Sequence, residues 1–161
     1  MKHEEGSRLF FTLFFFNFHS PIMAIQGSLK IKSRTYAVIE CAYEFNQSVD
    51  DTGKPVSRPK GGTITFVMPA SSDDDLFFYK WMFNKTETND GTFTFVVYSQ
   101  HNKRSSKTVM FKNGYCVGLK DYFNDNDSRL MYTTVTISAE EISVGMYDKA
   151  KFSNQWKGTS S

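Results

Sequence analysis

The chain has 161 residues, which suits one domain with a hydrophobic core of its own. Its formal net charge is only +2, with 19 Lys and Arg interspersed among 17 Asp and Glu, which argues against a nucleic-acid-binding protein. Aromatic residues make up 16% of the chain, and this richness in Phe and Tyr favours strands over helices. Cys41 and Cys116 lie far apart without metal-ligand spacing, so we expect free thiols.

The first 22 residues differ in character from the rest. Residues 9–18 (LFFTLFFFNF) are nearly all apolar, too short to span a bilayer but of the right length for a signal-peptide core. Glu4, Glu5 and Asn17 fit the signal template poorly. We therefore expect residues 1–22 to be a non-native or disordered extension, residues 23–157 to form the domain, and residues 158–161 to be a flexible tail.

From residue 23 onward, apolar and polar residues alternate, as is typical of strands with one buried face. Ile64, Phe66 and Met68, for example, are expected on one face of their strand. Asn113-Gly114 separates two such runs and predicts a hairpin. Many short strands of this kind predict a mainly β fold, an antiparallel two-sheet barrel or sandwich. The expected strands are residues 25–31, 37–46, 63–68, 92–97, 108–112, 115–123, 130–138 and 142–147.

Residues 72–84 break this alternation and predict a single helix. Ser71 or Ser72 would cap it, and Asp73 to Asp75 would lie in its first turn, where the helix dipole favours negative charge. Its apolar residues cover more than one face: one stripe holds Phe78, Trp81 and Met82, and outside it lie Leu76, Phe77 and Phe83. One sandwich can cover only one side of such a helix, so the sequence indicates contact with a partner.

Residues 47–62 (QSVDDTGKPVSRPKGG) form a long polar connection of mixed charge with two prolines. A loop of this length in a small domain is usually functional or disordered. The alternative is a solvated hairpin tip.

Groups suited to catalysis are scarce. His3 and His19 lie in the first 22 residues, and His101 stands in a basic, loop-like stretch with no nucleophile arrangement around it. The triplet Asp73 to Asp75 fits a helix start better than a metal site, and residues 125–127 lack the later oxygen ligands of a calcium loop. We therefore expect no catalytic residue, no cofactor, no metal, no nucleic-acid partner and no membrane insertion; a hydrolase is disfavoured.

The order of motifs resembles the tube proteins of type VI secretion systems, the hemolysin-coregulated protein family (Hcp or TssD). The resemblance spans residues 23–157. It is carried by IQGSL at 25–29, CAYEFNQ at 41–47, DTGKP at 51–55, SRP at 57–59, GG at 61–62, DDL at 74–76, WM at 81–82, KTVMF at 107–111, GYCV at 114–117 and ISAEEI at 137–142.

This resemblance implies a phage-tail-tube-like barrel, six copies closing into a ring, and rings stacking into a hollow tube. The implied partners are other copies, a contractile sheath, a spike at the tip and effector proteins in the lumen. The protein would be cytoplasmic during assembly and extracellular after firing.

The resemblance also suggests where subunits meet. The long loop is expected to make contacts between subunits or stacked rings through Asp50, Asp51, Lys54, Pro55, Arg58, Pro59 and Lys60. The helix is expected to pack on a neighbour through Leu76, Phe77 and Phe83. A tail-tube subunit of a prophage or another contractile injection particle is the alternative, followed by a secreted monomeric ligand-binding β-barrel.

Overall fold

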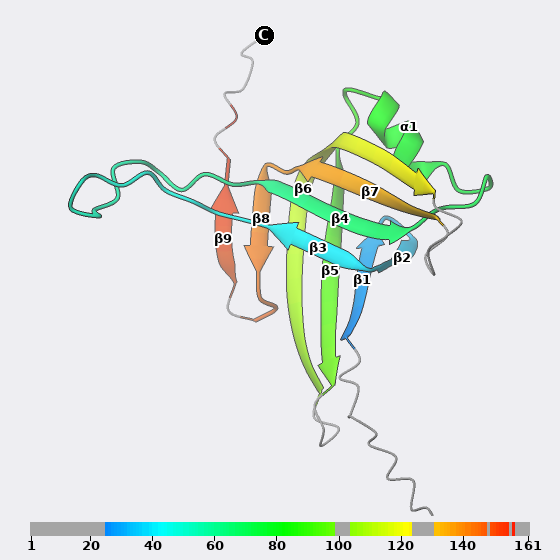
Figure 1. Ribbon diagram of the computed structural model, residues 1–161, viewed down its shortest axis with the longest axis horizontal. Helices are drawn as coiled ribbons and strands as arrows, with labels where there is room; N and C mark the ends of the chain where they lie inside the picture. Colours follow the sequence, from blue (N-terminus) through cyan, green and yellow to red (C-terminus); the bar gives the residue numbers. More distant parts are fainter. Residues whose placement is uncertain (1–24, 99–103, 124–130, 148, 155, 157–161) are drawn as a thin grey trace, which may run out of the picture.

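A computed structural model describes residues 25–98, 104–123, 131–147, 149–154 and 156 (Figure 1). This part of the chain is mainly β, as predicted, with one helix. Its elements are β1 (Ile25–Ile31), β2 (Arg34–Val38), β3 (Glu40–Tyr43), β4 (Thr63–Pro69), α1 (Phe77–Phe83), β5 (Asn89–Tyr98), β6 (Arg104–Phe123), β7 (Met131–Ser138), β8 (Glu141–Val144) and β9 (Ala150–Ser153).

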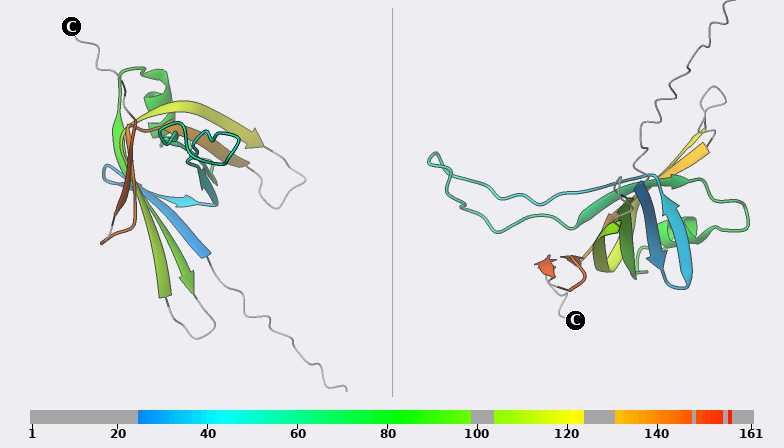
Figure 2. Two further views of the ribbon diagram at one scale, coloured as in Figure 1. Left: turned by 90° about the vertical axis from the view of Figure 1, so that its left-hand side faces the viewer. Right: turned by 90° about the horizontal axis from the view of Figure 1, so that it is seen from below.

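The strands form two antiparallel layers that share one long strand, β6. The first half of β6 pairs with β5 and β8, giving a layer in the order β2-β1-β5-β6-β8-β9. Its second half pairs with β7, giving a layer in the order β6-β7-β4-β3. The strands of the second layer run across those of the first (Figures 1 and 2). The predicted antiparallel sandwich is confirmed; among the described strands the sheet does not close into a barrel.

The predicted hairpin at Asn113-Gly114 is wrong, because β6 continues through it. Asn113 has a positive φ of 49°, and its backbone N–H donates to Asp90 Oδ1 at 2.8 Å. A Cβ on Gly114 would lie 2.8 Å from Ile137 Cγ2 and 2.9 Å from the Phe111 ring. The Asn-Gly pair thus bends one strand from the first layer into the second and leaves room for core side chains at the bend.

The prediction of one continuous strand at residues 37–46 is wrong, because the chain turns a second corner there. The chain leaves the first layer after Val38 and enters the second at Glu40. Val38 is buried, whereas Ala37 and Ile39 on either side of it are exposed, and the alternation changes phase after this point because Cys41 and Tyr43 pack against the core. The Ile39 N–H donates to the Val67 carbonyl at 2.8 Å and fixes this corner.

The core lies between the two layers and is built from the predicted inward faces. Ile64, Phe66 and Met68 are at most 2% exposed, which confirms the alternation in β4. The Phe66 ring lies edge-on to Phe93 with 5.3 Å between centroids, so the two layers meet through aromatic rings. In the described ranges no helix is long and apolar enough to span a membrane.

The helix is confirmed, but it begins at Phe77 and not at residue 72. The expected Ser71 or Ser72 cap does not form, and the aspartates lie before the helix in a turn, where the Asp75 N–H donates to the Ser72 carbonyl at 3.0 Å. The Asp75 carboxylate accepts the Phe77 N–H at 3.2 Å and pairs with Arg34 on β2. The ion pair with Arg34 draws Asp75 out of the helix and toward the first layer.

Candidate assembly surfaces

Residues 47–62, which we call the arm, project from the body of the molecule (Figures 1 and 2). Backbone bonds keep its two limbs together. Near the base, Asn46 and Lys60 exchange N–H to carbonyl bonds of 2.9 and 2.7 Å, and further out the Val56 N–H donates to Ser48 at 2.9 Å. The arm is therefore a narrow two-stranded extension and not a loop folded over the core.

The tip of the arm is ordered by Asp50. Its Oδ1 accepts bonds from the Thr52 N–H at 2.9 Å, the Thr52 hydroxyl at 2.7 Å and the Lys54 N–H at 2.9 Å. These bonds, chiefly the one from the Thr52 hydroxyl, lower the pKa of the Asp50 carboxyl. Gly53 supplies the positive φ of 84° that the turn requires. Asp50 thus shapes the tip and is half-buried in the process.

The side chains of the arm mostly face solvent. Of the predicted contact residues, those exposed are Asp51, Lys54, Pro55, Arg58, Pro59 and Lys60. Val49 and Val56, which the sequence did not single out, are 58% and 63% exposed on the same arm. Covering these two valines would remove apolar surface from water, which is favourable.

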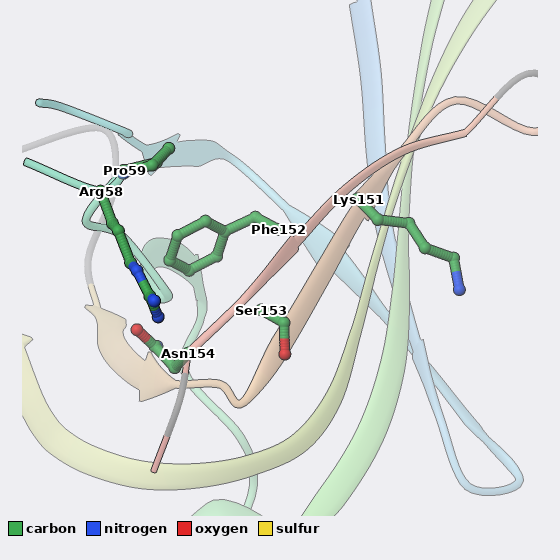
Figure 3. Close-up of a pocket in the computed structure, with 6 residues that line it drawn as sticks. All are labelled: Arg58, Pro59, Lys151, Phe152, Ser153 and Asn154. Atoms are coloured by element: carbon green, nitrogen blue, oxygen red, sulfur yellow. The ribbon is translucent and has the colours of Figure 1, made fainter. Parts of the chain in front are cut away.

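A shallow pocket of about 340 Å³ lies where the arm meets β9 (Figure 3). It is lined by Arg58, Pro59, Lys151, Phe152, Ser153 and Asn154. Arg58 and Pro59 come from the arm, and the others come from the C-terminal edge of the first layer. Strand β9 was absent from the expected elements, so the sequence had not indicated this junction.

The helix packs on the sandwich by one side only. Phe78 and Trp81 are 1% exposed, and the Trp81 indole N–H donates to the Glu87 carbonyl at 3.1 Å. Tyr79 hydrogen-bonds Asp121 on β6 through its hydroxyl, and this contact raises the pKa of Tyr79. The expected apolar stripe therefore does face the core.

The three residues proposed for a subunit contact differ in how much surface they offer. Phe83 is 82% exposed and Leu76 is 43% exposed. Phe77 is half-buried, with its ring centroid 6.3 Å from that of Tyr36 and the Lys32 ammonium 5.3 Å above it. Most of the uncovered apolar surface of the helix is thus concentrated at its C-terminal end, on Phe83.

Two further apolar side chains are exposed at the ends of β6 and β7. Phe123 and Met131 lie opposite each other in the strand register and are 69% and 46% exposed. The sequence analysis placed both residues in expected strands, at 115–123 and 130–138, but did not single them out as exposed.

The sequence profile of one family, hemolysin-coregulated protein Hcp (TssD), matches residues 23–157. The chain belongs to the Hcp family. Hcp proteins are the tube proteins of type VI secretion systems. A search of curated proteins finds no match to this chain.

Solved Hcp structures have the same fold. Hcp1 from Flavobacterium johnsoniae superposes with a TM-score of 0.69 at 28% identity, covering 80% of this chain and 99% of that one. Hcp1 from the E. coli EAEC 042 pathovar gives a TM-score of 0.63 at 13% identity, covering 81% and 98% of the two chains. An extracellular contractile injection system, the PVC sheath–tube complex, gives 0.50 at 13% identity, covering 80% and 93%.

The described part of this Hcp chain offers little reactive chemistry. Cys41 and Cys116 are free thiols, and burial raises the pKa of each to about 11, so both stay protonated at neutral pH. No cluster of His, Cys, Asp and Glu able to hold a metal is found among the described residues. His3, His19, His101 and the turn at 125–127 lie outside those residues.

Proposed function

We propose that this chain is the structural subunit of a type VI inner tube: six copies close into a ring, and rings stack into a hollow tube that sheath contraction expels. The observation that carries the proposal is the projecting arm in a member of a tube-protein family. Beyond its base, the arm carries the apolar side chains of Val49 and Val56, which the described part of the chain leaves exposed. A neighbouring copy would cover them.

The helix supplies the second contact in this proposal. Burying an exposed Phe or Leu side chain contributes about 1.5–3 kcal/mol. Phe83 and Leu76 are the helix residues that keep surface free for this. Burial of Phe83 in each of six identical contacts would therefore give the ring a substantial share of its stability.

The charged residues of the arm would set the register of stacking. Asp51 carries negative charge, and Lys54, Arg58 and Lys60 carry positive charge within the same arm. Complementary charges of this kind specify orientation more than they add affinity. The hydrogen bonds at the tip fix the arm before it binds, which reduces the conformational entropy lost on association.

The remaining partners follow from the same proposal. A contractile sheath would surround the tube, a spike protein would close its tip, and effector proteins would travel in its lumen. The subunit would assemble in the cytoplasm and reach the exterior when the system fires, without cofactor or catalysis.

The second candidate is a tube subunit of another contractile injection particle. The shared fold with the PVC sheath–tube complex favours it as an alternative, and the genes beside this one would distinguish the two. A secreted, monomeric ligand-binding barrel is the remaining alternative.

Negative-stain imaging of the purified full chain, paired with light scattering, tests the proposal. We expect hollow six-membered rings and, at higher concentration, stacks of rings. A single-subunit mass at every concentration would contradict the tube proposal and support the monomeric alternative.

A further inference from the structure

The second limb of the arm rejoins the body beside Asn154. The side-chain nitrogen of Asn154 donates to the Gly61 carbonyl at 3.2 Å and to the Ala139 carbonyl at 2.9 Å. Gly62 has a φ of +96°, and a Cβ there would lie 2.0 Å from Asn154 Nδ2. One amide group therefore links the arm to the corner between β7 and β8, and a glycine gives it the room to do so.

The chain just before the first limb of the arm rests on the same segment. The Phe45 ring lies 5.0 Å from that of Phe152, centroid to centroid. Figure 3 shows Phe152 pointing from β9 toward the arm, whereas Lys151 points away from it. A Cβ on Gly61 would lie 2.4 Å from the Phe45 ring, so the two limbs and β9 pack closely at this point.

Strand β9 is firmly attached but contributes little to the core. It pairs with β8 along its length, from Glu141 opposite Ser153 to Val144 opposite Ala150. The Asn154 N–H donates to the Glu140 carbonyl at 2.7 Å, and the Trp156 ring lies 5.6 Å from Tyr115. Three of the four residues of β9 are exposed, and the half-buried one is Phe152, which packs on the arm.

We propose that β9 and Asn154 form a clamp that fixes the direction of the arm, with Asn154 as its positioning residue. The inference rests on the proposed function, since the direction of the arm matters when identical copies must present their arms at one angle. A limb that is free to swing would sample many directions and would lose more entropy when it docks.

Amide hydrogen exchange in Asn154→Ala tests the clamp separately from assembly. The variant and the natural sequence are compared at a concentration where light scattering gives them the same mass. We expect the Asn46 and Lys60 amides at the base of the arm to exchange on the order of tenfold faster in the variant. The core amides of Phe66 and Phe93 should be unchanged. Lys149→Ala, an exposed substitution just before β9, is the control and should leave the arm amides unaffected.

Ring formation provides the second readout. Asn154→Ala should need a higher concentration to form rings, although its core exchange stays normal. Unchanged exchange at the base of the arm would overturn the proposal, as would faster exchange spread evenly over arm and core, because that would indicate a general structural role. If Asn154→Ala does not fold, Phe152→Leu decides the question by the same exchange measurement. If the natural chain never forms rings, the proposed function fails, and the exchange comparison still decides the clamp.

Discussion

Substitution of Phe83 should weaken ring assembly while leaving the stability of the single chain nearly unchanged. Its ring is 82% exposed at the end of α1, so Phe83→Ala should change the free energy of unfolding of the single chain by no more than about 0.5 kcal/mol. If a neighbouring copy covers the ring, the same substitution removes about 2 kcal/mol of apolar burial from each contact. That loss weakens each contact roughly 30-fold.

Mass photometry over a concentration series would give the midpoint of ring assembly, and chemical denaturation would give the stability of the subunit. Phe83→Leu keeps most of the apolar surface and should move the midpoint less than Phe83→Ala does. Trp81→Ala is the opposite case. Because Trp81 is 1% exposed, its loss should lower the free energy of unfolding by about 3–5 kcal/mol.

An unchanged assembly midpoint in Phe83→Ala would refute the role given to the helix. A fall in unfolding free energy comparable to that of Trp81→Ala would refute the reasoning in another way, because it would show that Phe83 supports the fold of its own chain.

Three further predictions concern the arm and the bend in β6. Replacing Lys54, Arg58 and Lys60 by Glu should preserve the unfolding midpoint but impair ring stacking, as seen by electron microscopy; normal tubes would exclude the arm from stacking. Because the pKa of Asp50 is lowered in the folded chain, its stabilisation is present above the unfolded value of about 3.9 and is lost as pH falls through the lower folded value. NMR shifts of the amides at the arm tip should therefore change below about pH 4, and a change that persists in Asp50→Asn would implicate another group. Gly114→Ala should lower the free energy of unfolding by about 1–3 kcal/mol in denaturant titrations, since its Cβ would crowd Phe111 and Ile137, and full stability would show that the bend has spare room.

The fold was largely predictable wherever a strand has one buried face. The alternation in β4 identified Ile64, Phe66 and Met68 as core residues, because burial of one face imposes a period of two on the sequence. The apolar excess of the helix likewise indicated uncovered side chains at Leu76, Phe77 and Phe83, of which Phe83 is the most exposed.

The corners could not be predicted in the same way. The same Asn-Gly pair can form a hairpin turn or a bend within one strand. At residue 113 the bend forms, and it is held by a bond to Asp90, which lies on another strand. The change of phase at Ile39 and the late start of α1 also depend on distant partners, the Val67 carbonyl and the Arg34 guanidinium. Tertiary contacts overrode local propensity at all three positions.

The junction between the arm and β9 was missed for a related reason. The short segment Ala150–Ser153 has one half-buried side chain, so it carries almost no alternation. Its importance lies in contacts with distant residues at the base of the arm. Phe152 packs on Phe45, and Asn154, the next residue after the strand, bonds Gly61, and the distance along the chain conceals both contacts in the sequence.

The mass of the assembled particle tests the central claim most directly. Native mass spectrometry of the full chain should give a closed particle of about 111 kDa, six copies of the 18.5 kDa chain, at concentrations where imaging shows hollow rings. A spectrum that contains only the single chain at high concentration would contradict the account of this protein as a tube subunit.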